Sequence, residues 1–478
     1  RIEYALKGGR INTDFIDSSA GVDCTDHEVN IKILLGDVVQ AGDMTMKQRD
    51  ELLASMTDEV GELCLRDNIL QNLALSMAGA RSIDALDAQR RFMRKLESAG
   101  RLDREIEILP PDEVLAERRQ AGHGLTRPEA AVLLAYAKTT LYADLLETAL
   151  PDREYFVGDL AKYFPRPLRR QFQDAIARHR LRREIVATWL SNSIVNRGLD
   201  IFVSELEDET GAALADIAMA YVVTRDSFAL LPLWSAVEAL GREVPADTQI
   251  AMLNEARATL IRGTRWFLAH TAKPFSITQA VGRFSEPIAR VMAALDQVTA
   301  PQQAKILSDV TSRYTKAGVE EDLARSVAGL RYLLAACDIT TVAGPLGEGG
   351  DADLLTTARV YFALDAELNL TWLRQQVERA AIETRWDRMA LSALEDELSE
   401  ALQRLTVAAI GAGVGRGDQT GETVPQARRW IGANLAAVDR YRRLLDELES
   451  TERPDLAMLN VAVGVVGKLL PRTVVNAA

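Results

Sequence analysis

The segment from Gly9 to Leu35 is the part of this sequence whose residue types and spacing suggest chemistry rather than packing. An extended-looking run, Ile11 to Ile16, leads into a turn of small residues, Ser18-Ser19-Ala20-Gly21. A helix is predicted to begin at Thr25, because Thr25 and Glu28 match the S/T-x-x-E capping box, which satisfies free donors of the first turn. A strand, a glycine turn and a capped helix N-terminus could bind an anion or a cofactor, because free N–H groups and the helix dipole point into the turn. A purely structural turn is the alternative.

The residues of this segment also carry a resemblance. From Ser18 to Glu28 they align, without gaps but with substitutions, with the pattern N-A-G-G-V-x-x-S-x-x-E that ends the nucleotide domain in the glutamate dehydrogenase superfamily. The segment resembles the large, NAD-specific bacterial glutamate dehydrogenases. The resemblance implies that Ser18, at the Asn position, and Gly21 contact the cofactor NAD. It also implies that Val22 and Thr25, at the Val and Ser positions, line the pocket for the glutamate side chain.

The resemblance continues along most of the chain and is less distinctive beyond about Pro301. The matching segments are LTRPE (125–129), VLLAYAK (132–138), YFP (163–165), HRLRREIVATWLSNSIVNRG (179–198) and RGTRWFL (262–268). The resemblance implies the conversion of L-glutamate, NAD and water to 2-oxoglutarate, ammonium and NADH by a homo-oligomer. No catalytic residue is assigned to this chain, because the family's phosphate-binding glycine loop and its catalytic lysine and aspartate would lie upstream.

Length, charge and composition limit the alternatives. A chain of 478 residues is too long for one core, so two or three compact units are expected. The net charge of −13 argues against a nucleic-acid partner. Three scattered cysteines indicate a reducing cytoplasm, and neither they nor the four histidines show metal-ligand spacing, so no metal site is predicted. No apolar run approaches the roughly 18 residues of a membrane span, so no membrane partner is expected.

Beyond Leu35 the apolar periodicity is helical. Helices are predicted to begin at Thr45, Thr57 and Ser82, and another at Thr126, with proline and glutamate in its first turn. The predicted fold is mainly α: a large multi-helix region behind a small strand-turn-helix remnant of a Rossmann-type dinucleotide domain. The predicted limits are residues 1–43 for this remnant, 44–310 for a helical domain and 311–478 for a bundle of long helices.

The arginine-rich stretch from Arg166 to Arg183 permits two interpretations. It could bind cofactor phosphates or an acidic neighbouring subunit, or it could be a solvated face paired with the chain's excess carboxylates. We favour the second, because surface ion pairs are common and individually weak.

Two hypotheses about function follow. A complete dinucleotide-binding domain needs several βαβ units of roughly 30 residues each, and only the closing strand-turn-helix is found here. We therefore expect a C-terminal fragment of an NAD-dependent glutamate dehydrogenase, inactive alone, that supplies part of the pocket floor and a helical scaffold. NAD would be bound mainly by the missing upstream domain. The alternative is a non-catalytic, all-helical module for oligomerisation or regulation.

Overall fold

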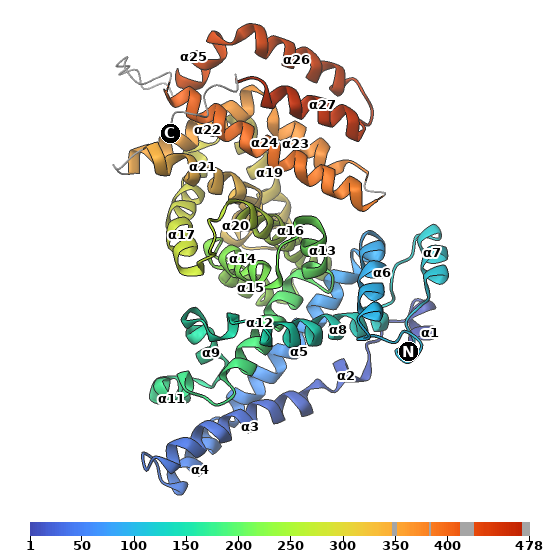
Figure 1. Ribbon diagram of the computed structural model, residues 1–478, viewed down its shortest axis with the longest axis vertical. Helices are drawn as coiled ribbons and strands as arrows, with labels where there is room; N and C mark the ends of the chain where they lie inside the picture. The colour runs from blue at the N-terminus through green and yellow to red at the C-terminus, as the bar shows by residue number, and fades with distance from the viewer. Residues whose placement is uncertain (347–350, 382–383, 412–424, 471–478) are drawn as a thin grey trace. The chain divides into compact units, whose positions relative to one another are not determined.

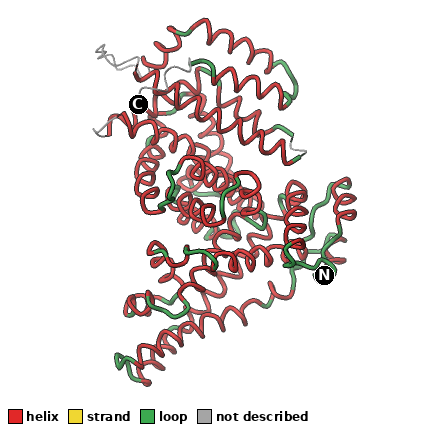
Figure 2. The backbone as a smooth tube through the Cα atoms, viewed as in Figure 1, coloured by secondary structure: helices red, strands yellow, loops and turns green. Residues whose placement is uncertain are grey.

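The computed structural model describes residues 1–346, 351–381, 384–411 and 425–470. Throughout this part of the chain the secondary structure is helical, without a β-strand (Figure 1; Figure 2). The prediction of a mainly α fold is therefore confirmed. The internal contacts divide the chain into two compact units: unit 1 is Arg1–Val222 with Ala246–Thr278, and unit 2 is Val223–Pro245 with Gln279–Ala478. The functional limits predicted after residues 43 and 310 stay a prediction.

Unit 1 is built around four helices, α3, α5, α8 and α12, which pack on one another in the pairs α3·α5, α5·α8 and α8·α12. Its helices are α1 (Ile2–Leu6), α2 (Asp14–Asp17), α3 (Ser19–Gln40), α4 (Met46–Ser55), α5 (Thr57–Gly79), α6 (Ser82–Ser98), α7 (Asp112–Gln120), α8 (Arg127–Leu146), α9 (Val157–Tyr163), α10 (Arg166–Gln171), α11 (Gln173–Ala177), α12 (Arg182–Gly198), α13 (Phe202–Thr210) and α16 (Ala246–His270). Helix α14 (Leu214–Ser227) crosses the boundary between the units.

The start of α8 shows how the sequence fixes an element locally. Thr126 is its N-cap, Pro128 lies in the first turn, and Glu129 completes a capping box with Thr126. From this start the helix buries one side, on which Leu133 and Leu145 are fully buried, against α12 and α5. The predicted helix starts at Thr45, Thr57 and Thr126 are confirmed. The LTRPE segment is therefore a helix start, and its Arg127 also donates hydrogen bonds to other segments, as described below.

The predicted strand-turn-helix at the N-terminus is wrong. Residues 11–13 form a loop, and Asp14–Asp17 form the short helix α2. Helix α3 begins at Ser19, so the predicted turn is mostly helical and Thr25 lies inside the helix rather than at its cap. An isolated strand is not stable without partners, and the described residues offer none. The S/T-x-x-E pattern is also compatible with a helix interior, so it does not by itself locate a helix start.

Unit 2 is centred on α24, which contacts α21, α22, α23, α25 and α27. Its helices are α15 (Leu230–Glu238), α17 (Ile277–Ala293, which begins at the boundary), α18 (Leu295–Val298), α19 (Pro301–Lys316), α20 (Glu321–Gly329), α21 (Leu333–Leu346), α22 (Asp351–Glu367), α23 (Leu370–Arg379), α24 (Arg385–Gly411), α25 (Pro425–Ala433), α26 (Leu435–Glu449) and α27 (Leu456–Gly467). The loop expected at residues 411–421 falls largely outside the described residues.

A buried carboxylate, that of Asp338, links three helices of unit 2 through hydrogen bonds. Asp338 of α21, 2% exposed, accepts hydrogen bonds from Tyr361 (2.8 Å), Ser399 (2.6 Å) and Gln403 (2.7 Å), which lie on α22 and α24. This carboxylate lies in the stretch Glu321–Gly344, which is long and apolar enough, by length and composition, to cross a membrane. However, 67% of its most apolar window is buried inside the protein, as is typical of a core helix.

Candidate functional site

The four residues expected to contact substrate and cofactor lie on one face of the N-terminal half of α3. Ser18 is its N-cap, and Gly21, Val22 and Thr25 follow at spacings of three, four and seven residues. Side chains three, four and seven positions apart share a face of a helix. All four residues are exposed, Val22 by 78%. The structure therefore brings the predicted residues together, although as a helical face rather than as a turn.

The hydroxyl groups of this face already donate hydrogen bonds to the backbone. Ser18 Oγ donates to the carbonyl of Asp14 at 2.6 Å, and Thr25 Oγ1 donates to the carbonyl of Gly21 at 2.9 Å. Each hydroxyl oxygen can still accept a hydrogen bond, and rotation of the hydroxyl group can direct its hydrogen to another acceptor. At Gly21 an added Cβ would meet no atom within 4 Å, so this part of the helix surface is open. The face can thus offer hydrogen bonds and methyl packing to a ligand.

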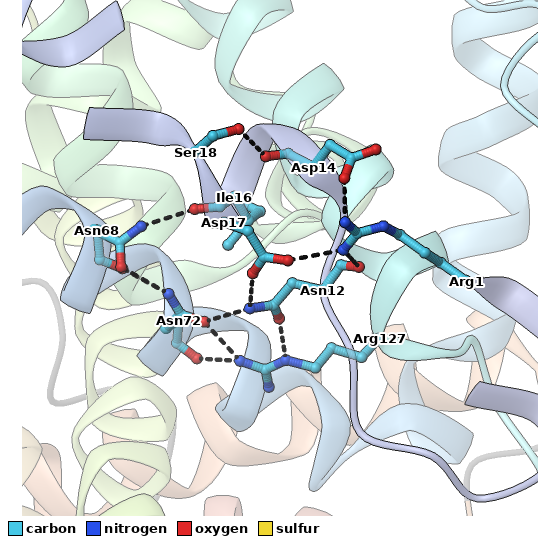
Figure 3. Close-up of polar contacts among 9 residues, drawn as sticks. All are labelled: Arg1, Asn12, Asp14, Ile16, Asp17, Ser18, Asn68, Asn72 and Arg127. Carbon is cyan, nitrogen blue, oxygen red and sulfur yellow. Dashed lines mark hydrogen bonds and ion pairs between the residues drawn. The ribbon is translucent and has the colours of Figure 1, made fainter. Parts of the chain in front are cut away.

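A polar network holds the segment that leads into this face (Figure 3). Arg1 donates to the Asn12 carbonyl at 2.8 Å and to the Asp17 carboxylate at 2.7 Å, and it also contacts the Asp14 carboxylate. Asn12 Nδ2 donates to the other oxygen of Asp17 at 3.1 Å. The hydrogen bonds from Arg1 and then Asn12 lower the pKa of Asp17 below its ordinary value, so this carboxylate is charged at neutral pH.

The same network reaches two other helices. Asn68 of α5 donates from Nδ2 to the carbonyl of Ile16 and to Ser19 Oγ, both at 2.8 Å. Arg127 of α8 donates to Asn12 Oδ1 at 2.5 Å and to both the carbonyl and Oδ1 of Asn72 at 3.1 Å. We name this group of Arg1, Asn12, Asp17, Asn68, Asn72 and Arg127 the polar hub. It fixes where α3 begins, because Ser19 and Ile16 flank the junction of α2 and α3.

Sequence reasoning missed most of the polar hub. Arg127 was noticed only as part of the LTRPE match, and Asn68 and Asn72 were not singled out. The signal that could have drawn attention is the pair of asparagines four residues apart among apolar neighbours of α5. Asparagine is a weak helix former, so a pair of asparagines inside a helix indicates a polar partner.

The opposite side of α3 is buried and is also bound by polar contacts. Tyr163 of α9 donates its hydroxyl hydrogen to Asp26 Oδ2 at 2.7 Å and accepts from Asn30 Nδ2 at 2.8 Å. The Tyr163 ring stacks on His27, with centroids 4.5 Å apart. His179 lies within 3.0 Å of the Asn30 carbonyl through Nε2. Helix α3 is therefore held on its inner side by α9 and by the segment that follows α11.

His179 makes the stability of unit 1 depend on pH. Its Nδ1 accepts the Leu181 N–H at 3.1 Å, so the proton lies on Nε2, which donates to Asn30. Burial lowers the pKa of His179, while its backbone hydrogen bond and the charges of Asp37 and Glu184 act in the other direction. The unfolded chain then binds the proton more readily than the folded chain, so folding stability is lost as pH falls below about 6.5.

We therefore expect His179→Gln to flatten the decrease in thermal stability between about pH 7 and pH 5, since glutamine does not titrate. The measurement is the midpoint of thermal unfolding across this range. His123→Gln is the matched control, because His123 is exposed and should leave the pH profile unchanged. An equal slope for wild type and His179→Gln would contradict this assignment.

The arginine-rich stretch is paired largely with carboxylates of unit 1. Glu59 lies 3.7 Å from both Arg166 and Arg169, and Asp37 contacts Arg180. Arg182 and Arg183 both contact Asp152. These contacts fit the interpretation as a charged face paired with carboxylates.

Unit 1 also contains a small cavity away from α3. It has a volume of about 280 Å³ and lies among α6, α8, α12 and α13. Among the charged groups on its lining, Lys95 contacts Glu207, and Arg101 binds Asp144 through two hydrogen bonds of 3.0 and 2.6 Å. Asp200, also on the lining, accepts a hydrogen bond from Gln89 at 2.8 Å. Each of these charged groups has a polar partner, and the walls of the cavity are mainly apolar.

Two family models match the chain. Residues 1–78 match the model described as bacterial NAD-glutamate dehydrogenase, catalytic domain. Residues 122–467 match the model described as glutamate dehydrogenase, C-terminal. The expected site on α3 lies in the first matched segment. The polar hub joins the two, since Asn12 and Asn72 belong to the first and Arg127 to the second.

Proteins similar to nearly the whole chain are known. The NAD-specific glutamate dehydrogenase of Pseudomonas aeruginosa is 40% identical over 464 residues, and that of Halomonas elongata is 39% identical over 463 residues. That of Mycobacterium tuberculosis is 33% identical over 470 residues. The alignments cover 97 to 98% of this chain but 28% of each of these relatives. With the C-terminal model matching more than half of its residues, the chain belongs to the family of bacterial NAD-specific glutamate dehydrogenases.

Proposed function

We propose that this chain is the C-terminal part of an NAD-dependent glutamate dehydrogenase, which converts L-glutamate, NAD and water to 2-oxoglutarate, ammonium and NADH in the cytoplasm. The exposed face of α3 forms part of the floor of the active site. Val22 packs against the methylenes of glutamate, and Thr25 donates its hydroxyl hydrogen to the distal carboxylate. Ser18 and Gly21 border the nicotinamide end of NAD. Most of the NAD site and the catalytic residues belong to another part of the enzyme.

One observation carries this proposal. The four residues assigned by resemblance come together on a single exposed helical face, inside the segment that matches the catalytic-domain model. The anion cradle expected at Thr25 no longer contributes, because the N–H groups there are inside α3. Recognition of a carboxylate at this face rests instead on the hydroxyl group of Thr25.

Exposed apolar side chains beside the face also support the proposal. Val29 of α3 is 46% exposed, and Leu65 and Ile69 of α5 are 61% and 44% exposed. Exposed apolar side chains on two helices that pack together are typical of an interaction site. A further part of the enzyme that covers α3 and α5 would bury these side chains and close the pocket over Val22 and Thr25.

The first experiment measures glutamate-dependent NADH formation by this chain alone and by the full-length enzyme. We expect turnover only from the full-length enzyme, because the chain spans 28% of the length of the curated relatives it matches. Turnover by the chain alone would contradict the assignment of catalysis to another part of the enzyme.

The second experiment replaces Thr25 in the full-length enzyme. Thr25→Ala should lower kcat/KM for glutamate by about 10- to 100-fold, which is the effect of losing a hydrogen bond to a charged group of about 1.5–3 kcal/mol. Thr25→Ser should keep most of the activity. Thr139→Ala is the matched control, because Thr139 is also exposed on a helix and donates to the carbonyl four residues before it. Equal losses in Thr25→Ala and Thr139→Ala would remove Thr25 from the pocket.

The alternative function, a non-catalytic module for oligomerisation or regulation, is favoured by exposed apolar side chains of unit 2. Trp386, Leu435 and Val461 are 66%, 51% and 56% exposed. The dehydrogenase function and the oligomerisation function are compatible if the helices of unit 2 form the contacts between subunits of the enzyme. The mass of the chain in solution, measured by light scattering, tests this: a stable dimer or larger oligomer supports assembly, whereas a monomer argues against it.

A further inference from the structure

Below the exposed face of α3, two helices bring together three metal-ligating side chains. Asp23 and His27 lie four residues apart, hence one turn apart on the same side of α3, and Asp67 faces them from α5. One donor atom from each of the three lies within 4.8 Å of the others. Nothing in the proposed contacts of glutamate or NAD uses these groups.

The imidazole of His27 is the observation that points to a ligand. The side chain is 4% exposed, and its Nδ1 is buried without a hydrogen-bond partner. Its Nε2 lies 4.0 Å from Asp67 Oδ2, which is beyond hydrogen-bond distance. Burial lowers the pKa of His27, so the ring is neutral and able to coordinate a metal. Stacking on Tyr163 fixes the ring plane.

Few cations of the protein act on the two carboxylates: Lys138 acts on both, and Arg66 acts on Asp67. Burial is the main cause that raises the pKa of Asp23, and it also raises the pKa of Asp67, to about 6, with help from the charge of Asp23. Lys138 of α8 is the cation that acts on both, but burial lowers its own pKa to about 8. Two carboxylates and a neutral imidazole in such surroundings attract a divalent cation.

The donor set selects the class of ion. Two carboxylate oxygens and one imidazole nitrogen suit borderline transition ions such as Zn²⁺, rather than Ca²⁺ or Mg²⁺, which prefer oxygen alone. Zinc binds such donors at about 2.0–2.2 Å, so two donors on one ion lie at most about 4.4 Å apart. Small rotations would close the site, and the 41% exposure of the Asp67 side chain leaves room for them.

We propose that Asp23, His27 and Asp67 bind one divalent transition-metal ion of the zinc class, which clamps α3 to α5 beneath the exposed face. Three protein ligands leave at least one coordination position for water. The ion supplies the partner that the buried imidazole lacks and neutralises the two carboxylates. The proposal concerns this chain alone and is independent of the glutamate dehydrogenase reaction.

The test titrates the chelator-treated chain with Zn²⁺ in a calorimeter, with Mg²⁺ as the comparison ion. We expect one Zn²⁺ per chain, a rise in the midpoint of thermal unfolding with Zn²⁺, and at most weak binding of Mg²⁺. Asp67→Asn should weaken Zn²⁺ binding at least tenfold. Because Asp67 is partly exposed, this variant should fold normally, which circular dichroism checks. Glu62→Gln, an exposed carboxyl on the same helix, is the matched control and should bind Zn²⁺ as wild type does.

A second variant tests the cation that competes for the site. Lys138→Met removes the positive charge that acts on Asp23 and Asp67 and should tighten Zn²⁺ binding by about 5- to 10-fold, as expected for one charge a few ångströms away. Absence of Zn²⁺ binding by the wild-type chain would overturn the proposal. Zn²⁺ binding that is the same in Asp67→Asn, Lys138→Met and wild type would also overturn it, since the ion would then occupy a surface site elsewhere.

Discussion

Glu129→Ala should lower the free energy of unfolding of unit 1 by about 3–5 kcal/mol, the cost typical of breaking a buried ion pair by removing one partner. Glu129 is 1% exposed and binds Arg118 through two hydrogen bonds of 2.7 and 3.0 Å. It also accepts the Thr126 N–H at 2.7 Å and the Thr126 hydroxyl at 2.8 Å. Alanine would leave the guanidinium of Arg118 buried without this partner and would remove half of the capping box of α8.

Urea unfolding followed by circular dichroism measures this loss. Glu129→Gln keeps an oxygen that can accept from Thr126 but removes the charge opposite Arg118, so it should show an intermediate loss. Glu117→Ala is the matched control: Glu117 is exposed on α7, and its removal should change stability by less than about 0.5 kcal/mol. A loss below about 1 kcal/mol for Glu129→Ala would show that the carboxylate is not a buried partner of Arg118.

Arg127→Met should lower the free energy of unfolding by about 2–4 kcal/mol, because it leaves several acceptors of the polar hub without their donor. Arg127 donates to Asn12, Asn72 and Ser76, which belong to the loop before α2 and to α5. Burial lowers the pKa of Arg127, whereas the charge of Asp17 raises it. The guanidinium is therefore partly buried, and its polar partners stabilise its charge.

Arg127→Lys should recover little of this loss, since one ammonium group cannot reproduce the planar fork that reaches separate acceptors. Arg10→Met is the matched control, because Arg10 is exposed and its loss should leave stability unchanged. In the full-length enzyme, Arg127→Met should also raise the KM for glutamate, because the polar hub fixes the start of α3, on which Ser18, Val22 and Thr25 lie. Wild-type stability and KM in Arg127→Met would show that the polar hub neither stabilises unit 1 nor positions the pocket.

The sequence predicted the helical class and several helix starts because these are local properties. The start of α4 at Thr45 and that of α8 at Thr126 follow from capping side chains within four residues. Breaks between consecutive helices are harder to predict than helix starts. Ala229 and Asn369 adopt positive φ angles of 50° and 49° and separate α14 from α15 and α22 from α23. Neither position is glycine or proline, the residues that most often interrupt a helix, so these two breaks are only weakly marked in the sequence.

At the N-terminal segment, local patterns predicted a strand and a turn that the structure does not contain. The run Ile11–Ile16 looked extended and Ser18–Gly21 looked like a turn, but a strand needs partners and a small-residue segment can also be helical. Asn68 binds the junction at Ile16 and Ser19 from a helix about fifty residues away, and this contact helps to decide where α3 begins. Such long-range contacts are invisible to a pattern read along the chain.

The sequence by itself determined the helical class, the capped helix starts and the family to which the chain belongs, because these depend on short-range patterns and on similarity. Only the tertiary structure decided that Ser18, Gly21, Val22 and Thr25 share a helical face, that Arg127 and Asn68 hold its start, and that Asp23, His27 and Asp67 meet beneath it. The physical reason is that side chains from different helices meet through packing, which no local sequence rule specifies.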